Sequence, residues 1–184
     1  IAGYNISCIG DDRVYSYLPS RDGNTLSDMA ALHVLKHIDP EFKHYTWLDR
    51  GSDERQYCAP GIDLPIATIM RSKYGEYPEY HTSLDNFELV TLKGLKGGFK
   101  VAKESIKILL KTIYPKTDIL CEPQMAKRGL YHTITTKDGQ YMIRKYMDFL
   151  QFSDGKNSLE QISKLIKTNL STTKKIYKIF KKKD

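Results

Sequence analysis

Residues 64–70 read Leu-Pro-Ile-Ala-Thr-Ile-Met, and this continuous apolar run indicates the fold class. A strand that is apolar on both of its faces is typical of a sheet covered on both sides. Residues 1–9 form a second, mostly apolar strand segment, and residues 13–18 and 44–48 predict two shorter strands.

Two segments of the same region have helical periodicity. Residues 25–38 begin at a Thr that suits a helix cap and end just before Pro40. Residues 91–113 predict the longest helix, with one buried stripe formed by Leu92, Leu95, Phe99, Ala102, Ile106, Leu109 and Ile113. Strands that alternate with helices predict an α/β fold with a mostly parallel sheet, whose functional residues lie at the carboxyl ends of the strands.

The remaining third of the chain has a different pattern. Residues 121–139 contain Pro and Gly with little periodicity, so we expect a linker there, with a short hairpin around 131–135. Three short helices follow, from 141, 158 and 171, with a Ser cap on each of the last two. This spacing is typical of a helix-turn-helix, and we expect a winged-helix-like module over 140–184 after an α/β segment over 1–120.

The net charge of +7 lies almost entirely in that last third. Residues 1–120 carry 15 Lys and Arg against 16 Asp and Glu, whereas residues 121–184 carry 14 against 6. Lysines in 171–183 suit contacts with nucleic-acid phosphates, and the alternatives are a solvated face or a protein-docking role. Ser171 and the two Thr residues after it occupy the positions where base readout usually needs Arg, Asn or Gln, so we favour the alternatives.

Composition excludes several classes of protein. Three cysteines are too few for a disulfide scaffold and favour a reducing, cytoplasmic location. No apolar run reaches the roughly 18 residues of a membrane span, so we expect no membrane association. The chain begins at Ile1, and we therefore expect it to be the later part of a longer protein.

Two polar loops, 50–63 and 71–85, bracket the apolar run at 64–70 and contain the best candidate chemistry. His81 lies in the second loop, and several carboxylates lie in both. Neutral imidazole is a good zinc ligand, and a nearby carboxylate can orient the ring. The alternative is an ordinary surface loop.

The two loops also carry a family resemblance. The order of short motifs in these loops resembles the second half of zinc aminopeptidases of the type that includes the glutaminyl cyclases. The motifs are Gly51-Ser52-Asp53, then Gly61-Ile62-Asp63-Leu64-Pro65, then Tyr80-His81-Thr82 with Asp85-Asn86. The whole chain is similar to a bacterial aminopeptidase-like group that ends in a winged helix. The resemblance implies zinc, a peptide or amide substrate, and hydrolysis of an N-terminal peptide bond or related amide. We also expect possible homo-oligomers, because missing strands would leave a sheet edge unpaired.

Residue roles follow from the resemblance. His81 matches the last zinc ligand of the family. Asp53, Arg55 and Tyr57 would lie on the substrate side, with Arg55 binding a substrate carboxylate. Glu54 stands where the family usually has His, at a position that shapes the pocket without binding metal.

Two departures from the family limit this interpretation. Ser7 stands where the family has a zinc-binding Asp, so either the second metal is absent or Asp11 or Asp12 supplies an oxygen. The family's first His, bridging Asp and Glu base have no counterpart in the 184 residues. We therefore expect half of an active site, and the competing hypothesis is a non-enzymatic scaffold or DNA-binding protein built on a degenerate peptidase fold.

Overall fold

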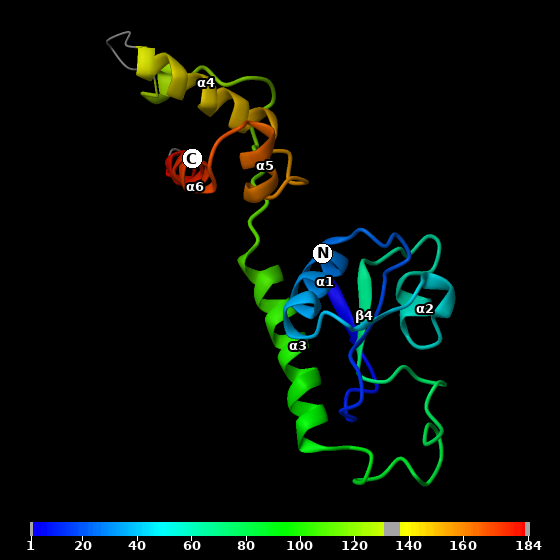
Figure 1. Cartoon of the computed structure of the whole chain (residues 1–184). Coiled ribbons are helices and arrows are strands. Elements are labelled where there is room, and N and C mark those ends of the chain that lie inside the picture. Colours follow the sequence, from blue (N-terminus) through cyan, green and yellow to red (C-terminus); the bar gives the residue numbers. More distant parts are fainter. Residues whose placement is uncertain (1, 131–136, 183–184) are drawn as a thin grey trace. The chain divides into compact units, whose positions relative to one another are not determined.

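The computed structural model describes residues 2–130 and 137–182, which form two compact units (Figure 1). The first unit is Ile1–Lys111 and the second is Thr112–Asp184. The division falls before the boundary expected at 120, because the carbonyls of Ile113 and Pro115 accept hydrogen bonds from the Leu159 and Gly155 N–H groups of the second unit. Met125 and Leu130, in the expected linker, belong to the core of that unit. The hairpin expected around 131–135 lies outside the described residues.

The first unit contains a four-stranded sheet in the order β1-β4-β2-β3. β1 (Gly3–Ile6) pairs in parallel with β4 (Ile66–Met70), and β2 (Ser16–Leu18) pairs in parallel with β3 (Lys43–His44). Only the central β2–β4 pairing is antiparallel. β4 is buried over most of its length, as its apolar sequence predicted. The α/β fold with a mostly parallel sheet is therefore confirmed.

The strand expected at 44–48 is wrong in its extent. β3 ends at His44, and Trp47–Asp49 forms a 3-10 helix. The Tyr45 N–H still donates to the Tyr17 carbonyl at 2.9 Å, but β2 ends at Leu18, so residues 46–48 would have no strand beside them for their backbone groups.

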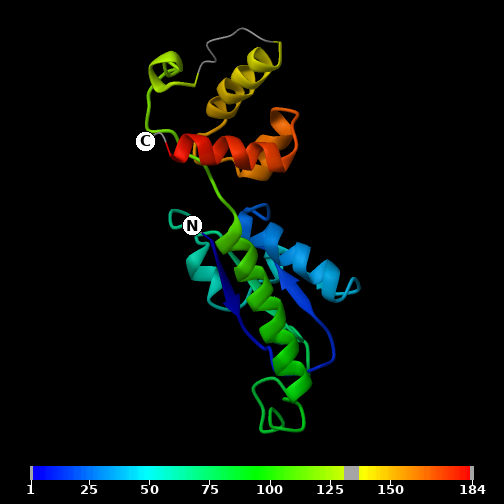
Figure 2. The same cartoon turned by 90° about the vertical axis from the view of Figure 1, so that its left-hand side faces the viewer.

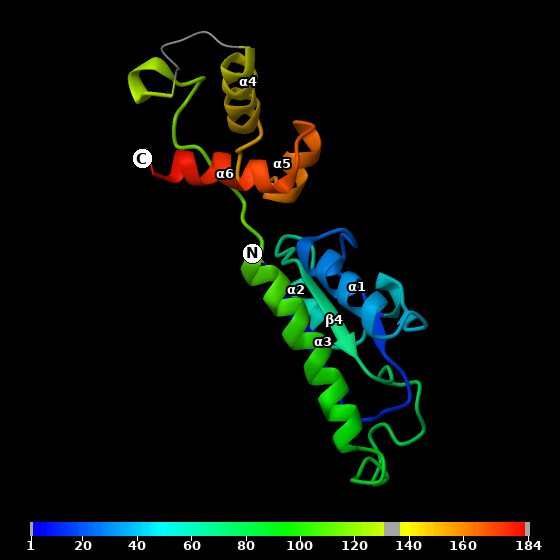
Figure 3. The ribbon, with the colours of Figure 1, turned by 60° about the vertical axis from the view of Figure 1, so that its left-hand side comes forward.

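Helices cover both faces of this sheet. α1 (Leu26–Ile38) and α3 (Leu92–Lys111) lie together on one side of β4, and the short α2 (Glu54–Tyr57) lies on the other side (Figures 1 and 3). The cap expected for α1 is confirmed, since Thr25 and Asp28 form a reciprocal capping box.

The buried stripe expected on α3 is wrong. Leu92, Leu95 and Phe99 are exposed, whereas the face turned to the sheet consists of small residues such as Gly94 and Gly98. A Cβ at Gly94 would overlap the backbone carbonyl of Gly10, so the glycines allow the helix to approach the chain closely. The helical spacing correctly predicted that α3 has an apolar face. It did not predict that a different face, made of small residues, packs against the sheet.

The second unit contains three helices, α4 (Lys137–Gln151), α5 (Leu159–Leu165) and α6 (Leu170–Lys181), beside a 3-10 turn at Ala126–Arg128 (Figure 2). Its core is formed by Met125, Leu130, Tyr146, Phe149, Leu159, Ile162, Ile166 and Ile176. The Ser158 cap and its Gln161 partner are confirmed. The cap expected at Ser171 is wrong, because the side chain of Asn169 accepts the hydrogen bond from the Thr172 N–H and the cap lies two residues earlier.

Within the described residues, no helix is long and apolar enough to cross a membrane.

Candidate functional site

The carboxyl ends of β1 and β4 lie side by side and form the framework of the site. The Ser7 N–H donates to the Ile69 carbonyl at 3.3 Å, and the Arg71 N–H donates to the Cys8 carbonyl at 3.0 Å. The segments that follow these two parallel strands therefore leave the sheet at the same edge. This is the edge at which sites form in α/β sheets.

Asp11 joins the two segments. Its carboxylate is buried and accepts hydrogen bonds from the Ser72 N–H at 2.8 Å, the Ser72 hydroxyl at 2.9 Å and the Arg13 N–H at 3.0 Å. Asp12 lies nearer the surface and pairs with Lys93 at 3.5 Å. Both carboxylates thus have partners within the first unit, and Asp11 holds the loop after β4 in place.

A surface ion pair ties the loop that carries His81 to the segment after β1. The Arg13 guanidinium binds Glu79 through two hydrogen bonds, of 3.0 and 2.6 Å. Tyr77 is close to the same segment: its burial and its hydrogen bond with Cys8 raise the pKa of its hydroxyl. The loop that contains the candidate ligand is therefore fixed against both strand ends.

His81 itself is exposed at the end of this loop. Its backbone has a φ of 59°, a left-handed conformation that non-glycine residues rarely adopt and that often occurs at functional sites. The ring stacks on Tyr80 with centroids 4.0 Å apart, and its nitrogens form no hydrogen bond with any described residue. The imidazole is thus oriented by stacking while both nitrogens stay accessible.

Glu54 is the central buried charge on the other face of the sheet. Its carboxylate accepts hydrogen bonds from the Gly51 N–H at 2.8 Å, the Ser52 N–H at 2.9 Å, the Tyr74 hydroxyl at 2.8 Å and the Asn5 side chain at 2.7 Å. Burial by itself raises the pKa of Glu54, but the hydrogen bonds outweigh burial and the net pKa is lowered. Glu54 therefore holds the start of α2 against the sheet as an ionised group.

The predicted substrate-binding residues Asp53, Arg55 and Tyr57 all lie on α2 or at its start, and all three are exposed. The Arg55 Nε donates to the Ser52 carbonyl at 3.1 Å, which leaves its terminal nitrogens accessible. Among the described residues, no hydrogen bond or ion pair joins these side chains to His81. The structure thus groups the three residues on or beside one short helix, without a hydrogen bond or ion pair to the predicted ligand among the described residues.

Aromatic side chains link α2, which carries the predicted substrate-binding residues, to His81. Tyr74, which binds Glu54, belongs to a buried cluster with Leu18 and Met70, and Tyr80 packs against that cluster. His81 stacks on Tyr80 in turn. A continuous path of packed side chains therefore runs from α2 to the His81 ring.

A complete zinc site does not form from the residues present. Over 2–130 and 137–182, no three His, Cys, Asp or Glu side chains come together in a way that could hold a metal ion. Zinc needs about three protein ligands in a catalytic site, and His81 would be one of them. The described residues therefore do not form a complete zinc site by themselves.

Sequence reasoning missed the structural roles of Glu54 and Asp11. The sequences of the strands did indicate a buried polar partner such as Glu54. Asn5 and Thr68 are polar residues within otherwise apolar segments, and their side chains need hydrogen-bond partners when they are buried. No comparable signal marked Asp11, whose partner Ser72 lies 61 positions away in the chain.

Two family models match the chain end to end. A domain of unknown function, DUF4910, matches residues 1–112, and a winged helix-turn-helix matches residues 112–184. The chain belongs to the DUF4910 family. The boundary between the two matches coincides with the division between the compact units, and the winged helix-turn-helix at the carboxyl end is confirmed.

Similar chains also come from Clostridium acetobutylicum. One, named "Putative polysaccharide biosynthesis protein with aminopeptidase-like domain", is 36% identical over 164 residues, which are 88% of this chain and 37% of that protein. The other is a crystal structure named a "putative peptidase", with a TM-score of 0.60 and 30% identity over all of this chain and 40% of that one. The resemblance to an aminopeptidase-like protein is confirmed, and the chain spans about two-fifths of the length of each relative.

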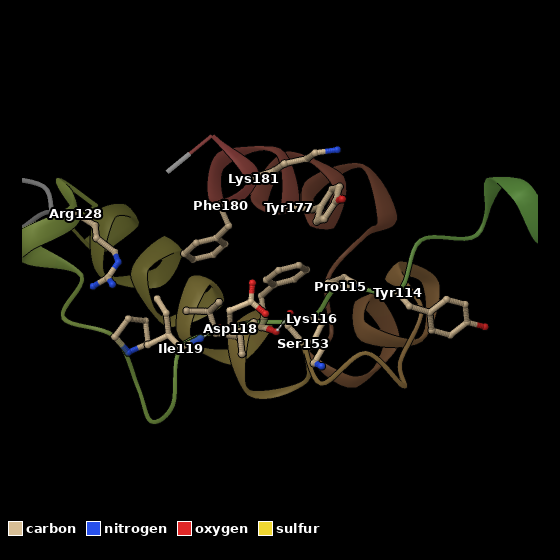
Figure 4. Close-up of a pocket in the computed structure, with 14 residues that line it drawn as sticks. Tyr114, Pro115, Lys116, Asp118, Ile119, Arg128, Ser153, Tyr177, Phe180 and Lys181 are labelled. Carbon is tan, nitrogen blue, oxygen red and sulfur yellow. Dashed lines mark hydrogen bonds between the residues drawn. The ribbon is translucent and has the colours of Figure 1, made fainter. Parts of the chain in front are cut away.

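The second unit contains a separate pocket of about 190 Å³ (Figure 4). Phe149, Tyr177 and Phe180 supply aromatic surface, and Asp118 lies near the middle of the view. Arg128 and Lys181 extend away from each other at its borders. Lys116 also lines the pocket, beside Asp118, so the charges around it are mixed.

Proposed function

We propose that this chain supplies part of a zinc-dependent aminopeptidase or related amide hydrolase, with His81 as one zinc ligand. The exposed imidazole at the carboxyl end of the parallel β1–β4 pair, fixed in a left-handed backbone conformation, carries the proposal. The names of both relatives support the peptidase-like part of the proposal. The remaining ligands and the base would come from polypeptide outside the described residues.

The residues of this chain would position the substrate. Arg55 presents free guanidinium nitrogens, which suit a bidentate contact with a carboxylate of the peptide or amide substrate. Asp53 and Tyr57 flank it on the same short helix. Glu54 has the supporting role, because its buried carboxylate fixes the backbone on which these three side chains stand.

We assign the reaction to the cytoplasm. Cys8, Cys58 and Cys121 are all free thiols, which is the state that a reducing compartment maintains.

The winged helix supports a second candidate function, nucleic-acid binding through its last helix. Exposed lysines cover one side of α6 and its end: Lys174, Lys175, Lys178, Lys181 and Lys182. In the first turn, however, Thr173 is buried, residues 170–173 include no Arg, Asn or Gln, and the Asn169 side chain is used as the cap. The helix therefore suits phosphate contacts without base readout, or docking to a protein.

The experiment compares the complete 184-residue chain with a chimera in which this chain replaces the 164 matched residues of the C. acetobutylicum relative. Both proteins are assayed with added zinc on amino-acid amides and short peptides. We expect no turnover by the free chain, and turnover by the chimera that a chelator and His81→Ala each abolish. His33→Ala, which changes an exposed imidazole on α1, is the matched control.

Three outcomes would contradict the proposal. The first is chelator-sensitive turnover by the free chain, because a complete site would then lie within it. The second is a folded chimera without activity on any substrate of the panel. The third is chimera activity that His81→Ala leaves unchanged.

A further inference from the structure

The pocket in the second unit has an aromatic wall (Figure 4). The rings of Phe149 and Phe180 stack with their centroids 5.9 Å apart and their planes inclined by 5°, and Tyr177 lines the same pocket. A cavity of roughly 150 Å³ can hold benzene. The pocket, with a volume of about 190 Å³, therefore has room for an aromatic ring or a branched alkyl group.

Two side chains of opposite charge line this pocket without a charged partner. Lys116 forms a β-bridge with Asp154, and the next N–H, that of Thr117, donates to the Ser153 carbonyl at 2.9 Å. Because side chains alternate in direction along such an extended segment, Lys116 and Asp118 extend from the same side of it. Among the described residues, neither side chain forms a hydrogen bond or an ion pair. An ammonium group and a carboxylate thus lie on one side of the segment with their hydrogen-bonding capacity unused.

The remaining charges at the border of the pocket are positive. Lys181 Nζ lies 6.0 Å from the centroid of the Tyr177 ring, and Arg128 donates to the Gln124 carbonyl at 3.5 Å. Three cations around one carboxylate disfavour a ligand that is only a cation. A carboxylate near the middle of the pocket disfavours a ligand that is only an anion. A zwitterion satisfies both signs of charge.

We infer that this pocket binds a free α-amino acid with a large apolar side chain. Asp118 binds the ammonium group, Lys116 binds the carboxylate, and the apolar side chain packs against the rings of Phe149 and Phe180. The two charged groups of an α-amino acid are attached to one carbon atom, so they suit two protein charges that extend from one side of one segment. Burial of the apolar side chain and contact of the ammonium with an aromatic face both favour binding.

This site belongs to the second unit, and its occupancy does not depend on the proposed function of the first. A free amino acid is nevertheless what hydrolysis of an N-terminal peptide bond releases. The second unit would therefore bind the class of product that the proposed reaction forms.

The test is an NMR titration of the complete 184-residue chain with L-phenylalanine, followed at the backbone amides. We expect saturable shifts at Asp118 and Ser153, with a dissociation constant of about 1 mM for a ligand of this size. L-phenylalaninamide lacks the carboxylate and N-acetyl-L-phenylalanine lacks the ammonium, so each should bind about 10-fold more weakly or less. Glycine, which has no apolar side chain, should cause no saturable shift at the same concentrations.

Two variants and a matched control assign the charges. Asp118→Asn and Lys116→Gln should each weaken the binding of L-phenylalanine by about 10-fold. Asp118→Asn should leave the weak binding of N-acetyl-L-phenylalanine unchanged, because that compound has no ammonium for the carboxylate to bind. Glu122→Gln, at an exposed carboxylate that does not line the pocket, is the control and should bind like the wild type. Asp118 and Lys116 are exposed, so thermal midpoints within about 2 °C of the wild type should show that both variants fold.

Several results would overturn the inference. The first is no saturable shift in the second unit with up to about 10 mM L-phenylalanine. Equal binding of the amide would assign the pocket to cations, and equal binding of the N-acetyl compound would assign it to anions. Asp118→Asn and Glu122→Gln variants that bind L-phenylalanine equally well would show that Asp118 does not hold the ammonium.

Discussion

The Tyr74 hydroxyl donates a 2.8 Å hydrogen bond to Oε1 of Glu54, and this bond joins the loop after β4 to the start of α2. Both side chains are buried. The same carboxylate oxygen accepts the N–H groups of Gly51 and Ser52, so one buried charge orders the segment that presents Asp53 and Arg55. The two loops of the candidate site are therefore connected through a buried hydrogen bond.

Replacing Glu54 with Gln should destabilise the first unit. The substitution removes the charge and turns an amide group toward backbone N–H donors, which should cost about 1–3 kcal/mol at pH 7. Chemical denaturation of the complete chain measures this. Glu88→Gln, at an exposed carboxylate, is the control and should be neutral. A loss of less than about 0.5 kcal/mol for Glu54→Gln would mean that the carboxylate does not support the loop.

The same variant should change how stability depends on pH. Because the folded-state pKa of Glu54 is lowered, its contribution is fully present above the unfolded pKa of about 4.3 and is lost as the pH falls through the folded pKa. The wild type should therefore lose more stability than Glu54→Gln on acidification below about pH 5. Identical acid profiles for the two proteins would show that Glu54 titrates alike in the folded and unfolded states.

Substitutions at Asn169 and Ser171 distinguish the cap of α6 seen in the structure from the cap expected from the sequence. Asn169 accepts the Thr172 N–H at 2.8 Å, whereas Ser171 is exposed within the first turn. Asn169→Ala should cost about 1 kcal/mol, and Ser171→Ala should be nearly neutral. Thermal unfolding of the complete chain distinguishes them, and the reverse order of effects would restore the Ser171 cap.

The basic helix should bind nucleic acid weakly if it binds at all. We expect the complete chain to bind random duplex DNA only at low salt, with an affinity whose logarithm falls by about 0.9 per phosphate contact for each unit of log salt concentration. A titration at several salt concentrations, with two unrelated duplexes, provides the test. A tight complex at physiological salt that distinguishes the two sequences would show that α6 reads bases.

The sequence predicted the strands, the α1 cap and the winged-helix unit because each depends on local patterns. The prediction of which face of α3 is buried was wrong, because this helix has both a face of large apolar residues and a face of small residues. Periodicity shows that a face is apolar but not which neighbour covers it, and the small residues at Gly94 and Gly98 gave the contact that mattered. It also failed at the end of β3, whose length is limited by the short partner strand.

The candidate site was predictable in its location and less so in its internal contacts. Two polar loops around an apolar strand indicated the sheet edge at which His81 lies. The hydrogen bonds of Glu54 and Asp11 join residues far apart in the chain, and such pairs leave no periodic trace in one sequence. Whether Arg55 approaches His81 depends on the fold alone, and in the described part of the chain a path of packed side chains runs from Glu54 on α2 through Tyr74 and Tyr80 to His81.

Zinc content of the chimera tests the central claim most directly. The purified chimera, its His81→Ala variant and the His33→Ala control are dialysed against the same low zinc concentration and analysed for bound metal. If His81 is a ligand, His81→Ala should lose most of the zinc, with an affinity lowered by at least about 10–100-fold, and His33→Ala should retain it. Equal zinc content in the chimera and its His81→Ala variant would contradict the assignment of His81 and the proposed function that depends on it.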